Sequence, residues 1–472
     1  METFNKITEK IDNIVWGVPL ILLILGCGIF LTIRVGGIQF RKLGLALKYM
    51  FKDEKDCTGE ISSFAALCTA LSATIGTGNI VGVATAIAAG GPGALFWMEI
   101  AALFGMATKY AEGLLAVKYR VKSADGKMLG GPFYYIENGL GRRWKCLAVL
   151  FAVFGVIVGL MGIGTFTQVN SITAAANSFF DPEKAHTVEL FGMDYTYTQI
   201  ITGLVITILA GLIIIGGIKR IASVSEIVIP IMVVVYVLCC LIIIFTHLTE
   251  IPAAVSEIIK SAFGLKAAAG GALGTIMVSM QKGVARGIFS NEAGLGSAPI
   301  AAAAAKTNEP VRQGLVTMTG TFIDTIIVCT MTGLTIVISG CINKNPDLEG
   351  VQITDAAFRY GLPFPEKISS FLLMICLMFF AFTTILGWNY YSERCLSYLT
   401  GSNKTASTIF KWLYIAAVFI GPYLTVSAVW NIADIFNGLM ALPNVIALIA
   451  LSGIISSETK KYCKKLKSEK RS

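Results

Sequence analysis

Two glycine-rich segments interrupt long apolar stretches of this sequence, and their residue types could bind a small charged solute. The first segment reads Ser72-Ala-Thr-Ile-Gly76-Thr77-Gly78-Asn79-Ile-Val-Gly82. Glycine and asparagine are poor helix formers, so this segment predicts a break in a helix. Within a bilayer, backbone groups released from a helix need another partner, such as a ligand, an ion or cavity water. A kink that serves only packing is the alternative interpretation.

The second segment reads Met280-Gln281-Lys282-Gly283-Val-Ala-Arg286-Gly287-Ile-Phe-Ser290-Asn291-Glu292-Ala-Gly294-Leu-Gly296. Its glycines and charges are costly in a bilayer unless they face protein or water, and the alternative is a loop outside the membrane. The N-terminus of a half-helix suits a carboxylate, whereas a half-helix C-terminus and unwound carbonyls suit an ammonium group or a hard cation. Paired breaks therefore predict a site for a small polar or zwitterionic solute with a coupling cation.

Membrane helices must position these breaks. The chain has 472 residues, of which 55% are hydrophobic and 14% charged, against about 25% charged residues in soluble proteins. Apolar runs of about 18 or more residues predict spanning helices. A soluble protein is excluded, and the expected class is an all-α polytopic membrane protein of about eleven spans. The expected spans are 14–34, 61–88, 93–117, 146–180, 197–218, 222–246, 267–300, 313–341, 368–393, 407–428 and 434–456.

The charges predict an orientation in the membrane rather than a nucleic-acid surface, although the net charge is +9. Of the 38 lysines and arginines, 27 lie in loops or tails on one side and eight on the other, and only Lys109, Lys282 and Arg286 fall within spans. By the positive-inside rule the N-terminus lies outside and the C-terminus in the cytoplasm. The first span is too long for a cleaved signal peptide, so we expect a retained helix. The eleven cysteines and two histidines form no transition-metal constellation.

The spans predict an inverted repeat. After the first span, ten remain in two sets of five, and an odd number inverts the second set relative to the first. The predicted organisation is an extra N-terminal helix and basic cytoplasmic loop (1–60), two five-helix repeats (61–250 and 267–457) and a basic cytoplasmic tail (458–472). An interrupted first helix in each repeat is the sequence pointer to a midplane binding site in secondary transporters.

At this point the sequence resembles the alanine or glycine:cation symporter family over about residues 15–457. The motifs that carry the resemblance are Ala70-Leu-Ser72-Ala-Thr-Ile-Gly76-Thr77-Gly78-Asn79-Ile-Val-Gly82, Gly91-Pro-Gly-Ala-Leu-Phe-Trp97-Met98, Gly105-Met-Ala-Thr108-Lys109-Tyr-Ala-Glu112, Gly130-Gly-Pro-Phe-Tyr-Tyr-Ile136 and Arg286-Gly-Ile-Phe-Ser-Asn291-Glu-Ala-Gly-Leu-Gly-Ser-Ala-Pro299. The resemblance implies a leucine-transporter-like fold with five-plus-five inverted repeats and one extra helix. It also implies sodium-driven, or less often proton-driven, uptake of alanine or glycine.

The resemblance further implies two sets of site residues. The substrate set is Thr77 and Gly78 at the carboxylate, with Gln168, Gln281 and Trp388. The sodium set is Asn79 at a first site, and the carbonyls around Ser72 and Ile75 with the hydroxyls of Thr383 and Thr384 at a second. Hard cations prefer such oxygen ligands, although the two threonine hydroxyls could instead bond to the preceding helical turn. Phe166 is a weaker candidate that suits packing.

Two carboxylates inside spans raise questions of their own. Glu99 departs from the family pattern, in which the position after Phe-Trp-Met is usually aromatic. It either lies near the interface or pairs with a cation, or else it alters the coupling ion or senses protons. Asp324 lies alone in an apolar span, with Arg286 as a conceivable partner.

We therefore expect a monomeric secondary active transporter of a prokaryotic cytoplasmic membrane, with sodium as the coupling ion, an amino-acid substrate and no covalent chemistry. Proton coupling on the same fold is the alternative. An ion channel would carry a repeated carbonyl filter or rings of charge, which the sequence lacks. A membrane enzyme would need a cluster of catalytic residues at one depth, and neither an enzyme nor a nucleic-acid partner is expected.

Overall fold

The apolar runs of the sequence form helices in the computed structural model, which describes residues 2–52, 54, 57–123, 126–190, 193–264, 272–423 and 427–469. The strands among these residues form two short antiparallel hairpins, β1 (Val121–Lys122) with β2 (Met128–Leu129) and β3 (Thr187–Leu190) with β4 (Met193–Thr196). The all-α polytopic class is therefore confirmed.

Nine helices among the described residues are long and apolar enough to cross a membrane, and a bent pair at the first glycine-rich segment makes ten. The expected count of eleven is not confirmed. The expected span 267–300 contains α14 (Ala272–Asn291) and α15 (Ala298–Ala302), while residues 267–271 lie outside the described residues.

The other elements follow the chain in order. The spanning helices are α1 (Glu2–Val15) with α2 (Val18–Arg34), α5 (Ser63–Thr74) with η1 (Gly78–Gly82) and α6 (Val83–Gly90), α7 (Gly93–Lys118), α9 (Lys145–Met161) with α10 (Phe166–Phe180), α11 (Tyr197–Ile214), α12 (Gly217–Thr246), α16 (Pro310–Thr321) with η5 (Phe322–Cys329) and α17 (Thr330–Ser339), α20 (Glu366–Leu399), α21 (Lys404–Ile420) and α22 (Ser427–Ala450). The shorter or connecting helices are α3 (Ile38–Arg41), α4 (Leu43–Met50), α8 (Pro132–Tyr135), η2 (Ile136–Leu140), η3 (Arg142–Trp144), η4 (Leu248–Glu250), α13 (Ile251–Ala262), α18 (Cys341–Lys344), α19 (Val351–Gly361), η6 (Gly421–Tyr423) and α23 (Ser452–Glu469).

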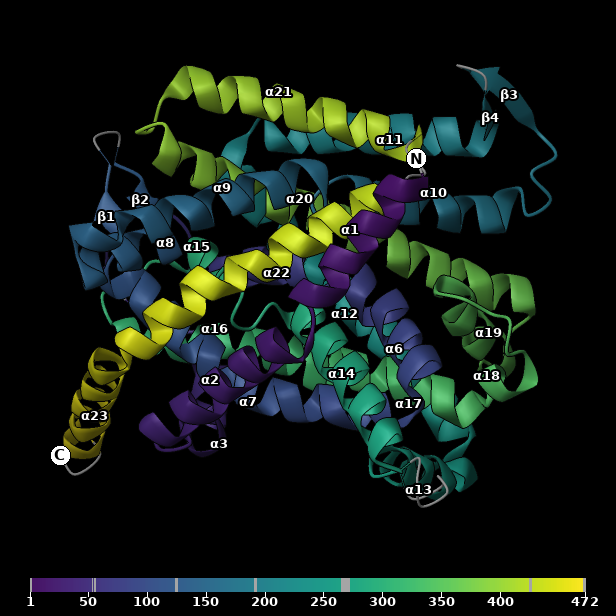
Figure 1. Cartoon of the computed structure of the whole chain (residues 1–472), viewed down its shortest axis with the longest axis horizontal. Helices are drawn as coiled ribbons and strands as arrows, with labels where there is room; N and C mark the ends of the chain where they lie inside the picture. The colour runs from purple at the N-terminus through teal and green to yellow at the C-terminus, as the bar shows by residue number, and fades with distance from the viewer. Residues whose placement is uncertain are drawn as a thin grey trace.

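The helices form a bundle with a small hairpin at each end. The β1–β2 hairpin and α23 lie at one end, and the β3–β4 hairpin lies at the other (Figure 1). Helix α22 crosses one face with α1 beside it, and the Trp16 indole N–H donates to the carbonyl of Asp434 at 2.9 Å. The N-terminal helix therefore packs on the last long helix of the second predicted repeat.

The outer surface of the bundle is apolar, as a bilayer requires. Helix α11 exposes Ile201, Leu204, Ile208 and Leu212, each more than 45% accessible. Helix α7 is buried over most of its length instead and packs against α14 and α16. Large exposed apolar surfaces are uncommon on soluble proteins, so α11 faces lipid and α7 forms part of the core that holds the breaks.

The run 146–180, expected as one span, is interrupted. Helix α9 ends at Met161 and α10 begins at Phe166, with two glycines between them. A Cβ on Gly162 would lie 2.3 Å from the Cβ of Ala433, and one on Gly164 would lie 2.6 Å from the Tyr414 hydroxyl. Neighbouring helices approach this point too closely for side chains, which composition alone did not reveal.

The second glycine-rich segment is unwound over a shorter stretch than expected. Met280 to Asn291 is continuous helix in α14. A Cβ on Gly283 would lie 2.1 Å from the carbonyl oxygen of Ala94, so this glycine permits close contact between α14 and α7. The predicted interruption of this segment lies at its C-terminal end, at residues 292–297, whereas Gly283 and Gly287 are helical and serve helix packing.

The C-terminal segment expected as a basic tail is helical. Residues of α23 contact other elements: the Thr459 hydroxyl lies 2.7 Å from the Tyr110 hydroxyl, and the Lys465 ammonium lies 2.7 Å from the Glu309 carboxylate. The boundaries of the predicted repeats stay a prediction.

Candidate functional site

The first break separates α5 from η1 and α6, whose axes differ by 54°. The Asn79 side-chain oxygen accepts the N–H of Gly76 at 2.9 Å, which partly replaces the lost helical bonds. The Thr332 hydroxyl on α17 donates to the carbonyl of Asn79 at 2.8 Å. Asparagine therefore stabilises the interruption by bonding to backbone, which is the local role that favours this residue outside regular helix.

The second break spans residues 292–297, between α14 and α15. Glu292, Gly294 and Gly296 have positive φ angles of 54°, 92° and 81°. Asn291 begins the break by accepting the N–H of Ala293 at 2.9 Å. Glycine adopts positive φ without strain, so the glycines of this stretch unwind the chain.

The two breaks meet inside the bundle. A Cβ on Gly78 would lie 3.3 Å from the Cα of Ser290. The Asn79 amide donates to a carboxylate oxygen of Asp324 at 2.8 Å, and the Ser290 hydroxyl donates to the other oxygen at 2.9 Å. The first break and the end of α14, just before the second break, therefore share one partner on η5. The Arg286 guanidinium lies over the Phe289 ring at 5.5 Å, and no ion pair found among the described residues joins it to Asp324, so the conceivable pairing is not seen.

Two further predicted residues, Thr384 and Gln168, lie beside Gly76 in the first break. A Cβ on Gly76 would lie 2.5 Å from the Thr384 hydroxyl oxygen and 3.7 Å from the side-chain oxygen of Gln168. The Gln168 oxygen is buried and accepts no hydrogen bond among the described residues. A Cβ on Gly387 would lie 2.7 Å from the Ser72 hydroxyl, so α20 packs directly on the end of α5. The amide of Gln168 can therefore offer an acceptor to a ligand.

The hydroxyls of the predicted second sodium site bond to their own helices. Thr384 donates to the carbonyl of Phe380 at 3.0 Å, Thr383 donates to the same carbonyl at 3.0 Å, and Ser72 donates to the carbonyl of Thr69 at 2.8 Å. This is the arrangement that the alternative interpretation described. A hydroxyl that donates its proton backwards retains its lone pairs, so this bonding is compatible with a cation ligand.

Trp388, the aromatic residue of the predicted substrate set, lies about one helical turn after Thr383 and Thr384 on α20. Trp388 is fully buried and its ring meets that of Tyr391 edge-on at 5.7 Å. Phe166 packs beside Gly421. A Cβ added to Gly421 would lie 3.4 Å from the Cα of Phe166. Trp388 also acts on the Glu292 carboxylate of the second break, whereas the contact of Phe166 is not to a residue of the breaks.

Gln281 is not brought to the first break. It lies ten residues before the end of α14 and lines a separate cavity of about 110 Å³. Asp12, Lys282, Arg286 and Asp434 line the same cavity. Lys282 and Arg286, two of the charges that looked costly in this span, thus face a polar cavity between α1, α6, α14 and α22.

Glu99 lies on α7 and is partly accessible. One of its carboxylate oxygens is buried and accepts no hydrogen bond among the described residues. No ion pair found in the described part of the chain includes Glu99. Pairing with a basic side chain is therefore not seen.

A buried polar network on α7, which the sequence did not predict, holds the second break. Glu112 accepts the N–H of Gly294 at 3.1 Å and the amide of Asn444 at 2.7 Å, and the same amide donates to the Gly294 carbonyl at 2.9 Å. Lys109 acts electrostatically on Glu112 and on Glu292. All three charged residues are at most 2% accessible.

The sequence contained one indication of this network, the three-residue spacing of Lys109 and Glu112. Residues three apart lie on one face of a helix, and both charges fall inside the apolar run 93–117. Tyr135 completes the network by donating to the Asn444 side chain. The network connects α7, α8 and α22 to the unwound residues of the second break.

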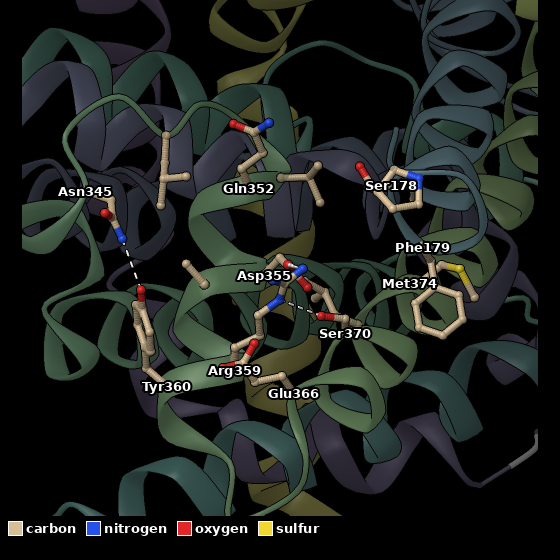
Figure 2. A pocket seen from close by; sticks show the side chains of 16 residues that line it. Ser178, Phe179, Asn345, Gln352, Asp355, Arg359, Tyr360, Glu366, Ser370 and Met374 are labelled. Atoms are coloured by element: carbon tan, nitrogen blue, oxygen red, sulfur yellow. Dashed lines mark hydrogen bonds and ion pairs between the residues drawn. The ribbon is translucent and has the colours of Figure 1, made fainter. Parts of the chain in front are cut away.

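Another cavity lies away from both breaks. It measures about 470 Å³ and is bordered by α10, α19 and α20 (Figure 2). On one side Asn345 donates to the Tyr360 hydroxyl at 3.0 Å, and at the centre Arg359 bonds to Ser370 at 2.8 Å and pairs with Asp355 at 2.7 Å. These five polar side chains already bond to one another, and none of the predicted site residues lines the cavity.

Comparison with known proteins agrees with the fold. The family described as the sodium:alanine symporter family matches residues 1–472. An uncharacterised transporter of Haemophilus influenzae is 55% identical over 466 residues, covering 98% of this chain and 97% of that protein. The sodium/alanine symporter AgcS of Methanococcus maripaludis is 46% identical over 466 residues, covering 97% of each protein.

Among solved structures, the crystal structure of MhsT in complex with L-phenylalanine has a TM-score of 0.54 at 13% identity, covering 85% of this chain and 98% of MhsT. At this identity the likeness shows the fold, and it confirms the expected leucine-transporter-like architecture.

Proposed function

Since the chain belongs to the sodium:alanine symporter family, we propose that it couples the entry of sodium to the uptake of alanine, glycine or both. The observation that carries the proposal is the meeting of two broken helices at Gly78 and Ser290, inside the bundle. Broken helices at corresponding positions of two repeats form the substrate and ion sites of secondary transporters.

The substrate carboxylate is proposed to bind at Thr77 and Gly78, where η1 begins. Free N–H groups and the positive end of the helix dipole favour an anion there. Gln168, beside Gly76, offers a buried acceptor for the substrate ammonium group. Trp388 is proposed to limit the size of the substrate side chain. Gln281 is left out of the proposed pocket because it lines a different cavity.

Sodium is proposed to bind at two places along the first break. The first site includes Asn79, and the second combines the carbonyls at Ser72 and Ile75 with the hydroxyls of Thr383 and Thr384. Oxygen-rich ligand sets suit hard cations. The C-terminal end of α5 adds partial negative charge at the second site.

Transport is proposed to proceed by alternating access, with one repeat rocking against the other around the shared site. The distribution of lysine and arginine supports a cytoplasmic C-terminus and inward transport in the cell membrane.

The function can be tested with the purified protein in liposomes. We expect saturable uptake of labelled alanine or glycine when a sodium gradient is imposed, and counterflow when unlabelled substrate is trapped inside. A proton gradient without sodium tests the alternative coupling. Uptake that requires only the proton gradient would contradict sodium coupling, and a conductance without counterflow would contradict a carrier.

Replacing Asn79 or Thr384 with alanine is expected to weaken sodium dependence. Loss of one oxygen ligand worth about 1.4 kcal/mol raises the sodium concentration for half-maximal uptake about tenfold. Thr408→Ala is the matched control. The Thr408 hydroxyl also bonds within its own helix, donating to the carbonyl of Lys404 at 3.0 Å, but Thr408 is exposed on α21. Wild-type sodium activation in both site variants would remove these residues from the ion sites.

A further inference from the structure

A further cavity opens beside the β1–β2 hairpin, at the end of the bundle that also carries α23 (Figure 1). It measures about 670 Å³ and is lined by the turn between α11 and α12, by the C-terminal half of α20 and by Lys411 of α21. None of the proposed substrate or sodium ligands lines it. By the positive-inside rule this end of the bundle is the one predicted to lie in the cytoplasm.

The lining of this cavity is basic. Its basic side chains come from five separate segments of the chain and are Lys127, Lys219, Lys306, Arg394 and Lys411. Its acidic side chains are Glu60 and Glu393, so positive charges exceed negative charges by three. Positive charges gathered around one concave space attract an anion.

The two carboxylates of the cavity each pair with one of the basic groups. The Arg394 guanidinium lies 3.7 Å from the Glu60 carboxylate, and the Lys411 ammonium lies 3.4 Å from the Glu393 carboxylate. Glu60 also accepts the N–H of Met128, at 2.8 Å. The four paired side chains are at most 21% accessible, so they form the less exposed part of the cavity wall.

Lys219 and Lys306 carry charge that no carboxylate offsets. Both are exposed, and neither occurs in an ion pair found among the described residues. The N–H of Lys306 donates to the carbonyl of Ile61 at 2.8 Å, which fixes its backbone. A Cβ on Gly217 would lie 4.0 Å from the Lys411 Nζ, so the turn that precedes Lys219 packs against α21. The uncompensated charge therefore sits on backbone that is held in place.

Apolar residues that face lipid border the cavity. Ile215, which belongs to its lining, is 57% exposed, and Trp412, the neighbour of Lys411, is 59% exposed. Tryptophan is enriched where a membrane meets water. An anion whose charged group enters the cavity can therefore keep its apolar chains in the bilayer beside α11 and α21. This arrangement favours a phospholipid over a soluble anion.

We propose that this cavity binds the phosphate group of an anionic phospholipid, of the phosphatidylglycerol or cardiolipin type. Basic pockets between membrane helices on the cytoplasmic side bind such headgroups. The Arg394 guanidinium has five N–H donors in a planar fork that matches phosphate oxygens, and Lys219 and Lys306 supply the uncompensated charge. The site goes beyond the proposed transport function, because it gives the chain a lipid ligand that joins α12, α20 and α21.

The test measures how tightly the purified full-length protein binds phosphatidylglycerol, as lipid adducts counted by native mass spectrometry during a titration in detergent. In the double variant Lys219→Gln/Lys306→Gln we expect the dissociation constant of the first bound lipid to rise by at least about tenfold, because each basic residue near an anionic lipid contributes several-fold to affinity. Both lysines are exposed, so their replacement is expected to leave the fold intact.

The double variant Lys460→Gln/Lys464→Gln is the matched control. Both residues are exposed on α23, at the same end of the bundle, and neither lines the cavity. The net charge falls by the same amount, and we expect this control to bind phosphatidylglycerol as the wild type does. An equal loss of affinity in both double variants, or no loss in Lys219→Gln/Lys306→Gln, would overturn the proposal.

Two further ligands identify the source of the phosphate. Phosphatidylcholine carries the phosphate without a net charge, and we expect it to bind more weakly than phosphatidylglycerol; equal binding would contradict an anionic-lipid site. Inorganic phosphate carries the charge without acyl chains, and we expect it not to displace the lipid at equal concentration. Displacement would assign the cavity to a soluble anion and overturn the lipid assignment. Because the readout is lipid binding, the result does not depend on which amino acid or ion the protein transports.

Discussion

Gly76→Ala is expected to reduce sodium-driven alanine uptake by about 100-fold or more. The added Cβ would lie 2.5 Å from the hydroxyl oxygen of Thr384, far inside van der Waals contact. Thr384 is held by its bond to the Phe380 carbonyl, so either this hydroxyl rotates away or the first break shifts. Displacements of about 1 Å in a binding site reduce rates by about 100-fold.

The reason is steric rather than conformational, because Gly76 does not have a positive φ. An alanine can therefore adopt the backbone angles of this position, and we expect the variant to reach the membrane in folded form. The same Cβ would also approach Gln168 at 3.7 Å. That distance is ordinary van der Waals contact, so the proposed sodium ligand Thr384 is the group with which the added Cβ clashes.

Gly82→Ala is the matched control for this prediction. Gly82 belongs to the same motif and has helical angles, and a Cβ there would meet nothing within 4 Å. Uptake by this variant should stay near the wild-type rate, with both proteins reconstituted at equal amounts. Equal activity of the two variants would show that the contact at Thr384 is unimportant for transport.

Lys109→Gln is expected to destabilise the folded protein and lower its melting temperature, because it removes a buried positive charge near buried carboxylates. Lys109 is 2% accessible and acts electrostatically on the carboxylates of Glu112 and Glu292. Without it, two buried carboxylates share one region without compensation. Glu112 also binds the N–H of Gly294, so we expect the second break to loosen and transport to fall with stability.

Lys118→Gln on the same helix is the control for Lys109→Gln. The Lys118 ammonium also pairs with a carboxylate, that of Glu458 at 3.0 Å, but it is 30% accessible. Exposed pairs contribute only about 0–1 kcal/mol. Thermal unfolding in detergent should therefore separate the two variants. Equal melting temperatures would contradict an electrostatic role for Lys109 in the core.

Much of the site could be predicted from the sequence, because helix-breaking composition is a local property. The motif around Gly76 and Asn79 predicted the first break, and the structure unwinds the chain there. The second segment was located correctly but its extent was not. Gly283 and Gly294 are the same residue type, yet Gly283 is helical beside Ala94 whereas Gly294 has a φ of 92°. The distance to a neighbouring helix separates the two roles.

Side-chain partners were the least predictable feature. Arg286 was only a conceivable partner of Asp324, and in the structure Asn79 and Ser290 bond to Asp324 instead. Gln168 lies near Gly76, whereas Gln281 lines another cavity. Both glutamines occupy apolar runs, and the sequence contains no information on which helix face each one occupies relative to the breaks.

The sequence by itself determined the membrane class, the two interrupted helices and, through its motifs, the transporter family. These depend on hydropathy and backbone propensity, which act over a few neighbouring residues. Tertiary structure alone decided which polar groups meet: Asp324 between the two breaks, Thr384 against Gly76, and Glu112 with Asn444 at Gly294. Such contacts join residues far apart in the chain, and a buried polar group is stable only where the packing of several helices supplies its partners.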